Sequence, residues 1–150
     1  MEKKILIGID LSENSLKAVD YVGRMMSSDP KVQITLLNVI RQPSPDVMPD
    51  EKERISHVER LYAETASLME EAGKRLSSQG IPQANIHIKI QVCDRLVSIS
   101  ELILQEQKRE GYETVVIGRR GMTKRQEFLF GSVSKKIVTD ARDCVVWVVE

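Results

Sequence analysis

The amino-acid sequence predicts an α/β domain, an open five-stranded parallel sheet with helices on both of its faces. Three observations carry this prediction. Short apolar runs rich in branched residues alternate with segments of helical periodicity, the alternation continues to the last residues, and no linker or internal repeat interrupts it. Right-handed crossovers then return each strand parallel to the one before it. The 150 residues match the usual size of one domain, so residues 1–150 are expected to form a single domain.

Five runs have the length and composition of strands. Four of them are apolar and nearly continuous, as is typical of strands covered on both faces: Lys4–Asp10, Val32–Ile40, Thr114–Gly118 and Cys144–Val149. The fifth, Ile86–Val92, alternates apolar and polar residues, which favours a position at the edge of the sheet.

Segments of helical periodicity fill the gaps between these strands. The expected helices cover Leu16–Met26, Val58–Leu76 and Leu96–Gln107, and a fourth begins close to Ser132. The second helix is expected to end near Gly80, because glycine can adopt the left-handed cap and a proline follows shortly after it. The connection Arg41–Glu53 contains three prolines, so we expect it to lack regular structure.

Composition argues against several classes of function. The chain has 22 basic and 22 acidic residues, so no net charge favours nucleic acid or an anionic membrane. No apolar run approaches the roughly 20 residues that a membrane-spanning helix needs. Cys93 and Cys144 lie far apart without the spacing of a metal site, and Met1 is followed by charged residues rather than by a signal peptide. We therefore expect a cytoplasmic protein with no metal site of its own.

Ligands of open α/β sheets bind beyond the carboxyl ends of the strands. Asp10, Val39 and Gly118 close three of the expected strands and so belong to this edge. Gly118 also lies in the stretch IGRRGMTKRQEFLFGSVSKK, which is rich in glycines, cations and hydroxyls. Glycine permits a positive φ and lets an anion approach backbone N–H groups without a Cβ in the way. The stretch therefore predicts a phosphate site.

The remainder of that stretch supports the same chemistry. Gly121 supplies further bare backbone, and Gly131–Ser132 is expected to place a hydroxyl and unpaired amides at a helix N-terminus, which attracts anions. Arg119 and Lys124 add cations nearby. The Walker pattern and the G-x-G-x-x-G pattern are both absent, which excludes the usual mononucleotide and dinucleotide loops.

The glycine spacing G-x2-G-x9-G-S, combined with IGID in the first strand and LLNV in the second, resembles the ATP-binding branch of the universal stress protein family. The resemblance covers essentially the whole chain. It implies an adenine nucleotide alpha hydrolase-like fold, a Rossmann-like three-layer sandwich, with the base held by Asp10 and Val39. It implies that ribose and phosphates are held by Gly118, Arg119, Gly121, Gly131, Ser132, Val133 and Ser134. The implied ligand is ATP, ADP or AMP, with Mg²⁺ bound through the phosphates.

Catalytic residues are not expected. Asp10 is the only carboxylate that closes a strand, and the resemblance assigns it to the base, which leaves no second acidic group for phosphoryl transfer. We therefore expect a stress-response switch with an unknown downstream partner and at most slow hydrolysis. Two alternatives stay open: a Mg²⁺-dependent ATPase or phosphate-transferring enzyme, and a dimeric interaction module that binds no nucleotide. An alternative for Asp10 itself is a purely structural N-cap of the first helix.

The final run, Cys144–Glu150, predicts a homodimer. It is apolar on both faces, and an uncovered apolar edge strand pairs readily with another chain. A two-fold dimer in which this strand pairs antiparallel with its own copy would satisfy both edges and bury Trp147 against the partner. The family resemblance points the same way. The alternative is an edge shielded by a helix or loop of the same chain.

Overall fold

The structure is a computed structural model that describes residues 3–10, 12–94, 96–118 and 124–150, with the backbone alone described for residues 124–131. Its elements are β1 (Lys4–Gly8), α1 (Glu13–Met26), β2 (Gln33–Arg41), α2 (Glu51–Ser78), the short 3₁₀ helix η1 (Gln83–Asn85), β3 (Ile86–Cys93), α3 (Ile99–Glu110), β4 (Thr114–Gly118), α4 (Lys124–Asp140) and β5 (Val145–Val149). The predicted alternation of strand and helix is confirmed.

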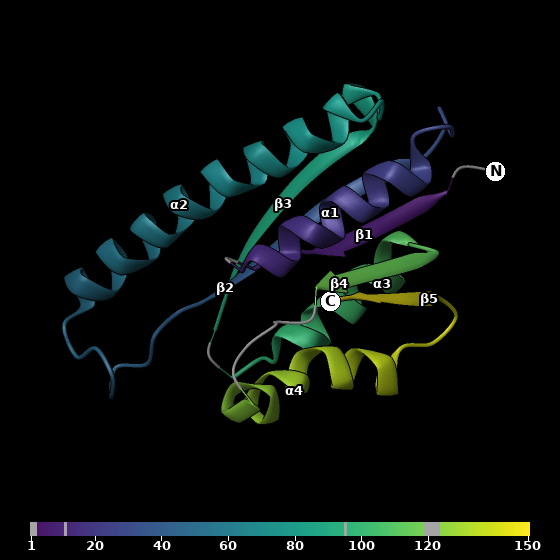
Figure 1. Ribbon diagram of the computed structural model, residues 1–150. Coiled ribbons are helices and arrows are strands. Elements are labelled where there is room, and N and C mark those ends of the chain that lie inside the picture. Colours follow the sequence, from purple (N-terminus) through teal and green to yellow (C-terminus); the bar gives the residue numbers. More distant parts are fainter. Residues whose placement is uncertain (1–2, 11, 95, 119–123) are drawn as a thin grey trace.

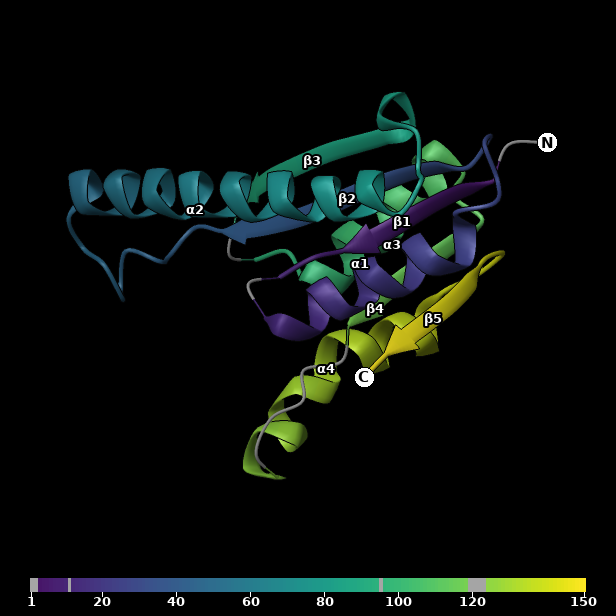
Figure 2. The same cartoon turned by 45° about the horizontal axis from the view of Figure 1, so that its top comes forward.

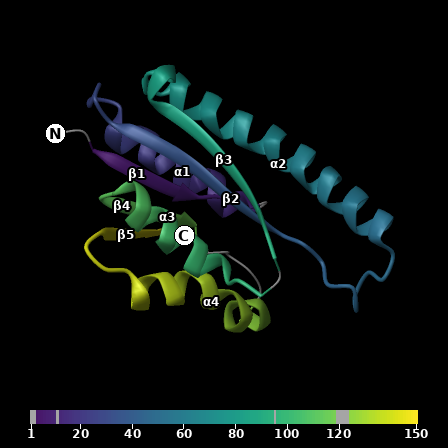
Figure 3. The ribbon, with the colours of Figure 1, turned by 180° about the vertical axis from the view of Figure 1, so that it is seen from behind.

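The strands form one sheet in the order β3-β2-β1-β4-β5, and every neighbouring pair is parallel. Helices α1 and α2 cover one face of this sheet, and α3 and α4 cover the other (Figures 1 and 3). The predicted fold class, an open parallel sheet in a three-layer sandwich, is confirmed. The alternating run became the edge strand β3, as expected, and none of its residues is fully buried.

Two hydrophobic clusters, one on each face, fill the space between sheet and helices. Ile7, Val19 and Leu36 are fully buried in the cluster beneath α1 and α2. Leu6 and Val115 are fully buried in the cluster beneath α3 and α4. Residues next to each other in a strand point to opposite faces, which explains why β1 and β4 read as continuous apolar runs.

The boundaries of α2 and α3 differ from those expected. α2 begins at Glu51, inside the segment expected to be irregular, because Asp50 caps it by accepting a hydrogen bond from the Lys52 backbone N–H at 3.0 Å. α3 begins only at Ile99, after the N-cap Ser98, so Leu96 lies outside it. The expected end of α2 is confirmed, since Gly80 has a φ of +104°.

The start of α4 corrects a second expectation. The helix begins at Lys124, so Ser132 lies inside it rather than at its first turn. The physical reason lies in the sequence KRQEFLF, which contains no proline or glycine and is composed largely of residues with good helix propensity. Gly131 costs such a helix about 1 kcal/mol relative to alanine, which is too little to end it.

Candidate functional site

The carboxyl ends of β1 and β4 mark the point where the winding of the chain reverses. From β1 the chain proceeds outward through β2 to β3, then returns to place β4 on the other side of β1. The helices that follow β1 and β4 therefore leave toward opposite faces of the sheet, as Figure 2 shows for α1 and α4. Such a switch point leaves a crevice between the two connections.

A cavity of about 430 Å³ occupies this crevice. Its volume falls in the range of small-molecule sites, roughly 300–1,000 Å³. Its lining includes six of the residues that the sequence predicted for the site: Asp10, Val39, Gly118, Ser132, Val133 and Ser134. Three others cannot be placed in it: Arg119 and Gly121 lie outside the described residues, and only the backbone of Gly131, within α4, is described.

Asp10 lies between the end of β1 and the start of α1. Its Oδ1 accepts hydrogen bonds from the backbone N–H of Ser12 at 2.8 Å and from the hydroxyl of Ser15 at 2.7 Å, and it also contacts the Ser12 hydroxyl. The N-cap position belongs to Ser12, so Asp10 is not the N-cap residue that the structural alternative supposed. The hydrogen bonds hold its carboxylate in one orientation at the wall of the cavity.

Gly118 is required for a reason that the sequence did not reveal. A Cβ at this position would lie 2.5 Å from the carbonyl oxygen of Asn14 and 2.9 Å from the nitrogen of Ser15. The end of β4 therefore packs directly against the first turn of α1. Among the described residues, the glycines with positive φ are Gly80 and Gly111, so the positive φ considered for the signature is not observed at Gly118.

The α4 wall of the cavity also differs from the expected geometry. Ser132 was predicted to stand at a helix N-terminus, where unpaired amides attract an anion, but it lies within α4. Amides inside a helix are used by its own hydrogen bonds, so this part of the predicted phosphate chemistry is wrong for the described structure. What α4 offers the cavity is the hydroxyls of Ser132 and Ser134, with Val133 between them.

Sequence reasoning missed Asn38, a polar residue of β2 that also lines the cavity. It is only 7% exposed, and its Nδ2 donates a hydrogen bond to the carbonyl of Ile9 at 2.7 Å, which ties the ends of β1 and β2 together. Its Oδ1 is buried and has no hydrogen-bond partner in the described part of the chain. The available signal was a lone amide interrupting the apolar run LLNVI.

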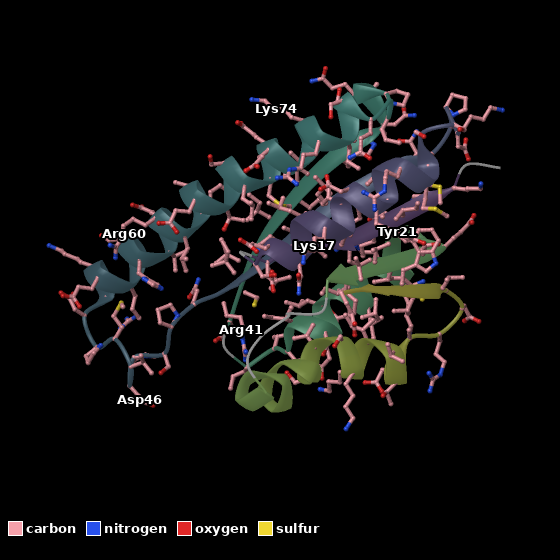
Figure 4. The ribbon with its side chains drawn as sticks, viewed as in Figure 1. Lys17, Tyr21, Arg41, Asp46, Arg60 and Lys74 are labelled. Atoms are coloured by element: carbon pink, nitrogen blue, oxygen red, sulfur yellow. The ribbon has the colours of Figure 1, made fainter. Side chains whose placement is uncertain are left out.

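Arg41 was also missed as a site residue, having been assigned to the loop that follows β2. It is instead the last residue of β2 and lines the cavity. Figure 4 labels its side chain. It is the only cation among the described lining residues. Beside it, burial raises the pKa of the Cys93 thiol, an effect that Arg41 opposes. Cys93 is therefore a neutral thiol near pH 7.

The rest of the lining is largely apolar. Branched side chains from both faces of the sheet and from α2 and α3 contribute: Ile9, Leu37, Ile40, Leu61, Ile99, Ile103 and Ile117. Such a surface suits a flat, weakly polar group such as an aromatic ring. The polar groups of the wall are the serine hydroxyls, the carboxylate of Asp10 and the guanidinium of Arg41. No group of three or more potential metal ligands occurs within the described ranges.

The fold and this crevice together define an α/β protein with its ligand site at a topological switch point. A profile of the universal stress protein family matches residues 1–150. The chain therefore belongs to the universal stress protein family. No curated protein sequence matches it. Among the helices of the described residues, none is long and apolar enough to cross a membrane.

Solved structures similar to this chain have the same fold. The hypothetical protein MJ0577 is 26% identical, with a TM-score of 0.79 over 98% of this chain and 94% of its own. A universal stress protein in complex with cAMP is 19% identical, with a TM-score of 0.68 over 99% and 96% of the two chains. The universal stress protein from Archaeoglobus fulgidus in complex with dAMP is 13% identical, with a TM-score of 0.64 over 99% and 98%.

Proposed function

We propose that this protein, acting as one universal stress protein domain, binds an adenine nucleotide (ATP, ADP or AMP) in the cavity between β1 and β4. The observation that carries the proposal is the convergence of six predicted residues, from the turn after β1 and from β2, β4 and α4, on one cavity. Support comes from two members of the same family whose structures were solved with cAMP and dAMP.

The chemistry of the wall suggests how the nucleotide lies. The apolar part formed by Leu37, Val39 and Ile117 receives the adenine ring, whose exocyclic amine donates to the carboxylate of Asp10. The ribose and phosphates extend toward Gly118 and the hydroxyls of α4, together with Arg119, Gly121 and Gly131. Mg²⁺, where present, is held by the phosphates, as is usual for this ion.

The proposed role is that of a stress-response switch in the cytoplasm, in which occupied and empty forms present different surfaces to a downstream partner. At most slow hydrolysis is expected, because Asp10 is the only carboxylate among the described lining residues and its Oδ1 already accepts three hydrogen bonds. Phosphate release that stops when Mg²⁺ is removed, at rates typical of enzymes, would favour the ATPase alternative.

Substitution of Asp10 by asparagine tests the binding mode. An asparagine retains one acceptor oxygen for Ser12 and Ser15, so the turn into α1 should persist. Its amide nitrogen would then face the amine of adenine, donor against donor. We expect Asp10→Asn to lower the affinity for ATP by about tenfold or more, since a hydrogen bond to a charged group contributes about 1.5–3 kcal/mol. Calorimetric titration with ATP, ADP and AMP provides the measurement.

The matched control is Asp140→Asn, which removes an exposed carboxylate at the end of α4, away from the cavity lining. This variant should bind ATP as the parent does. Native mass spectrometry of freshly purified parent protein should show a retained adenine nucleotide. A parent that binds none of the three nucleotides would contradict the proposed function and favour the interaction module. Equal affinities for Asp10→Asn and parent would contradict the placement of the base.

We also propose a homodimer through Cys144–Glu150. Supporting it, β5 lies at the margin of the sheet, and Val145 and Val148 are 53% and 40% exposed. Trp147 was expected to be buried against the partner. Its ring instead packs edge-on against Tyr21 of α1 in the same chain, with the ring centroids 5.7 Å apart. That contact involves a side chain, whereas the alternative of an edge shielded by the same chain concerns the backbone edge of β5, which is the part proposed to pair.

A further inference from the structure

Helix α2 is much longer than the surface that it covers. Its 28 residues span about 42 Å at 1.5 Å per residue, whereas the eight residues of β3 beneath it span about 26 Å. All of its buried residues lie between Thr65 and Leu76. The half from Glu51 to Glu64 projects past the sheet, as Figures 1, 2 and 3 show from three directions.

The projecting half continues the apolar face of the covered half. In the covered half the buried positions are Thr65, Met69, Ala72 and Leu76, at alternating spacings of four and three. The same alternation extends backward to Tyr62, Val58 and Ile55, which we call the overhang stripe. Ile55 is 52% and Tyr62 46% exposed. A spacing of this kind is that of a helix packed against another helix.

The loop before α2 leaves Ile55 and Tyr62 of the overhang stripe exposed, and Val58 between them is partly buried. Met48 of this loop lines a small hollow with Lys52, Glu53, Ser56 and Arg60. On an α-helix Glu53, Ser56 and Arg60 lie opposite the stripe, and Lys52 lies at its flank. Figure 4 labels Arg60 and Lys74 on α2. Helical spacing places the stripe on the side of the helix opposite to these two residues.

We propose that the overhang stripe docks against the overhang stripe of a second copy of this chain, with the two helices antiparallel. A parallel arrangement is excluded by the molecule itself, because the same face is covered by the chain's own sheet from Thr65 onward. Antiparallel helices keep the two domain bodies at opposite ends of the pair. A two-fold axis then makes the same surface serve both copies.

Charge complementarity selects both the partner and the register. With Ile55 opposite the second copy's Val58, Lys52 faces the second copy's Glu59, and the symmetry repeats this ion pair. The same register places Tyr62 opposite the second copy's Glu51, a potential hydrogen-bond acceptor. If one helix were shifted along the other by one seven-residue repeat, Glu59 would instead face Glu59 of the second copy, and the two like charges would repel. Lys52 and Glu59 are exposed, and neither forms an ion pair with another described residue.

The contact is expected to be transient. Three apolar residues on each side of so short a helix pair bury less than the roughly 1,200 Å² of stable complexes. Association should therefore emerge between about 10 µM and about 500 µM protein. None of the three stripe residues lines the nucleotide cavity or belongs to β5, so the experiments below test this contact separately from both proposals above.

Charge reversal provides the test. Sedimentation velocity over that concentration range should show a rise in mass for the parent. Lys52→Glu and Glu59→Lys should each weaken the association about tenfold or more, because attraction becomes repulsion at two symmetric sites.

An equimolar mixture of the two variants should associate as the parent does. In the mixed pair the two reversed charges face each other at one contact, and the two original charges, Lys52 and Glu59, face each other at the symmetric contact. Lys74→Glu, on the outer face of the covered half, is the matched control and should behave like the parent.

Loss of association in each single variant, with recovery in the mixture, supports the antiparallel pairing. A parent whose mass does not change with concentration, single variants that associate like the parent, or a mixture that fails to recover would each overturn it. Because all three substitutions change exposed residues, circular dichroism should show an unchanged fold for every variant.

Discussion

At the scale of single residues, the shape of the cavity depends on close backbone contacts as well as on the side chains that line it. Gly118 lies at the end of β4 against the first turn of α1, where a side chain would collide with the backbone of Asn14 and Ser15. Asn38 connects the ends of β1 and β2 through its bond to Ile9. Both Gly118 and Asn38 line the cavity, so the packing of the strand ends and the shape of the site are inseparable.

Replacing Gly118 with alanine is expected to destabilise the protein by about 2 kcal/mol or more, because the colliding atoms belong to backbone and can yield only by moving α1. Gly73→Ala is the matched control. Gly73 lies within α2, and a Cβ there would have 3.8 Å to its nearest neighbour, so alanine should stabilise by about 0.5–1 kcal/mol. Urea denaturation measures both. A Gly118→Ala variant as stable as the parent would contradict the close-packing explanation.

At the level of elements, α3 is anchored to β3 through a buried carboxylate. Glu106 of α3 is 2% exposed and pairs with Lys89 of β3 and with Arg109 one turn along its own helix. A buried charge of this kind is tolerated only when its partners are in place. The pair with Glu106 raises the pKa of Lys89 above its ordinary value of 10.5, against the smaller opposing effect of burial.

This pair predicts a loss of stability at alkaline pH. A lysine whose pKa is higher in the folded than in the unfolded state contributes its full stabilisation below pH 10.5, and the contribution is lost as the pH rises through the folded-state value. We expect the free energy of unfolding of the parent to fall above about pH 10.5 more steeply than that of Lys89→Met. Urea denaturation between pH 8 and pH 11.5 measures the difference.

At neutral pH, Lys89→Met is expected to lower the free energy of unfolding by about 2 kcal/mol. This is less than the roughly 3–5 kcal/mol that a buried charge without any partner costs, because Arg109 still pairs with Glu106. Lys74→Met, which removes an exposed lysine of α2, controls for the loss of a surface charge. Parallel pH profiles for parent and Lys89→Met would show that the pair has no part in the alkaline transition.

For the whole molecule, the outer strand β5 is expected to determine the basic assembly. Its backbone edge pairs with β4 on one side and, among the described residues, with no strand on the other. Lysines at Val145 and Val148, both exposed on the single chain, should convert a dimer into a monomer at about 10 µM. Analytical ultracentrifugation gives the masses.

The control for this assembly prediction is Val138→Lys, which places a lysine on an exposed position of α4, 56% accessible, away from the strand edge. It should leave the mass unchanged. A parent that sediments as a monomer at that concentration would remove β5 from the assembly, and so would a double variant that remains dimeric.

The sequence by itself determined the order and direction of the elements and most of the strand boundaries. Strand and helix periodicities are local properties, and a parallel sheet follows from their alternation because crossovers have one hand. Asp10, Val39 and Gly118 could be assigned to one edge for the same reason, since each lies at or near the carboxyl end of a strand. Their convergence on a shared cavity needed no further information than the topology.

Only the tertiary structure decided the features that depend on residues distant in sequence. The collision that requires glycine at 118 comes from α1, and the fixed orientation of the Asn38 amide comes from Ile9. Arg41 entered the site because β2 continues farther than its apolar pattern. The start of α4 was mistaken because a glycine inside a helix costs only about 1 kcal/mol, which the surrounding residues of good propensity offset. Periodicity records which face of an element is apolar, whereas contacts between elements decide which of those residues is buried and what it touches.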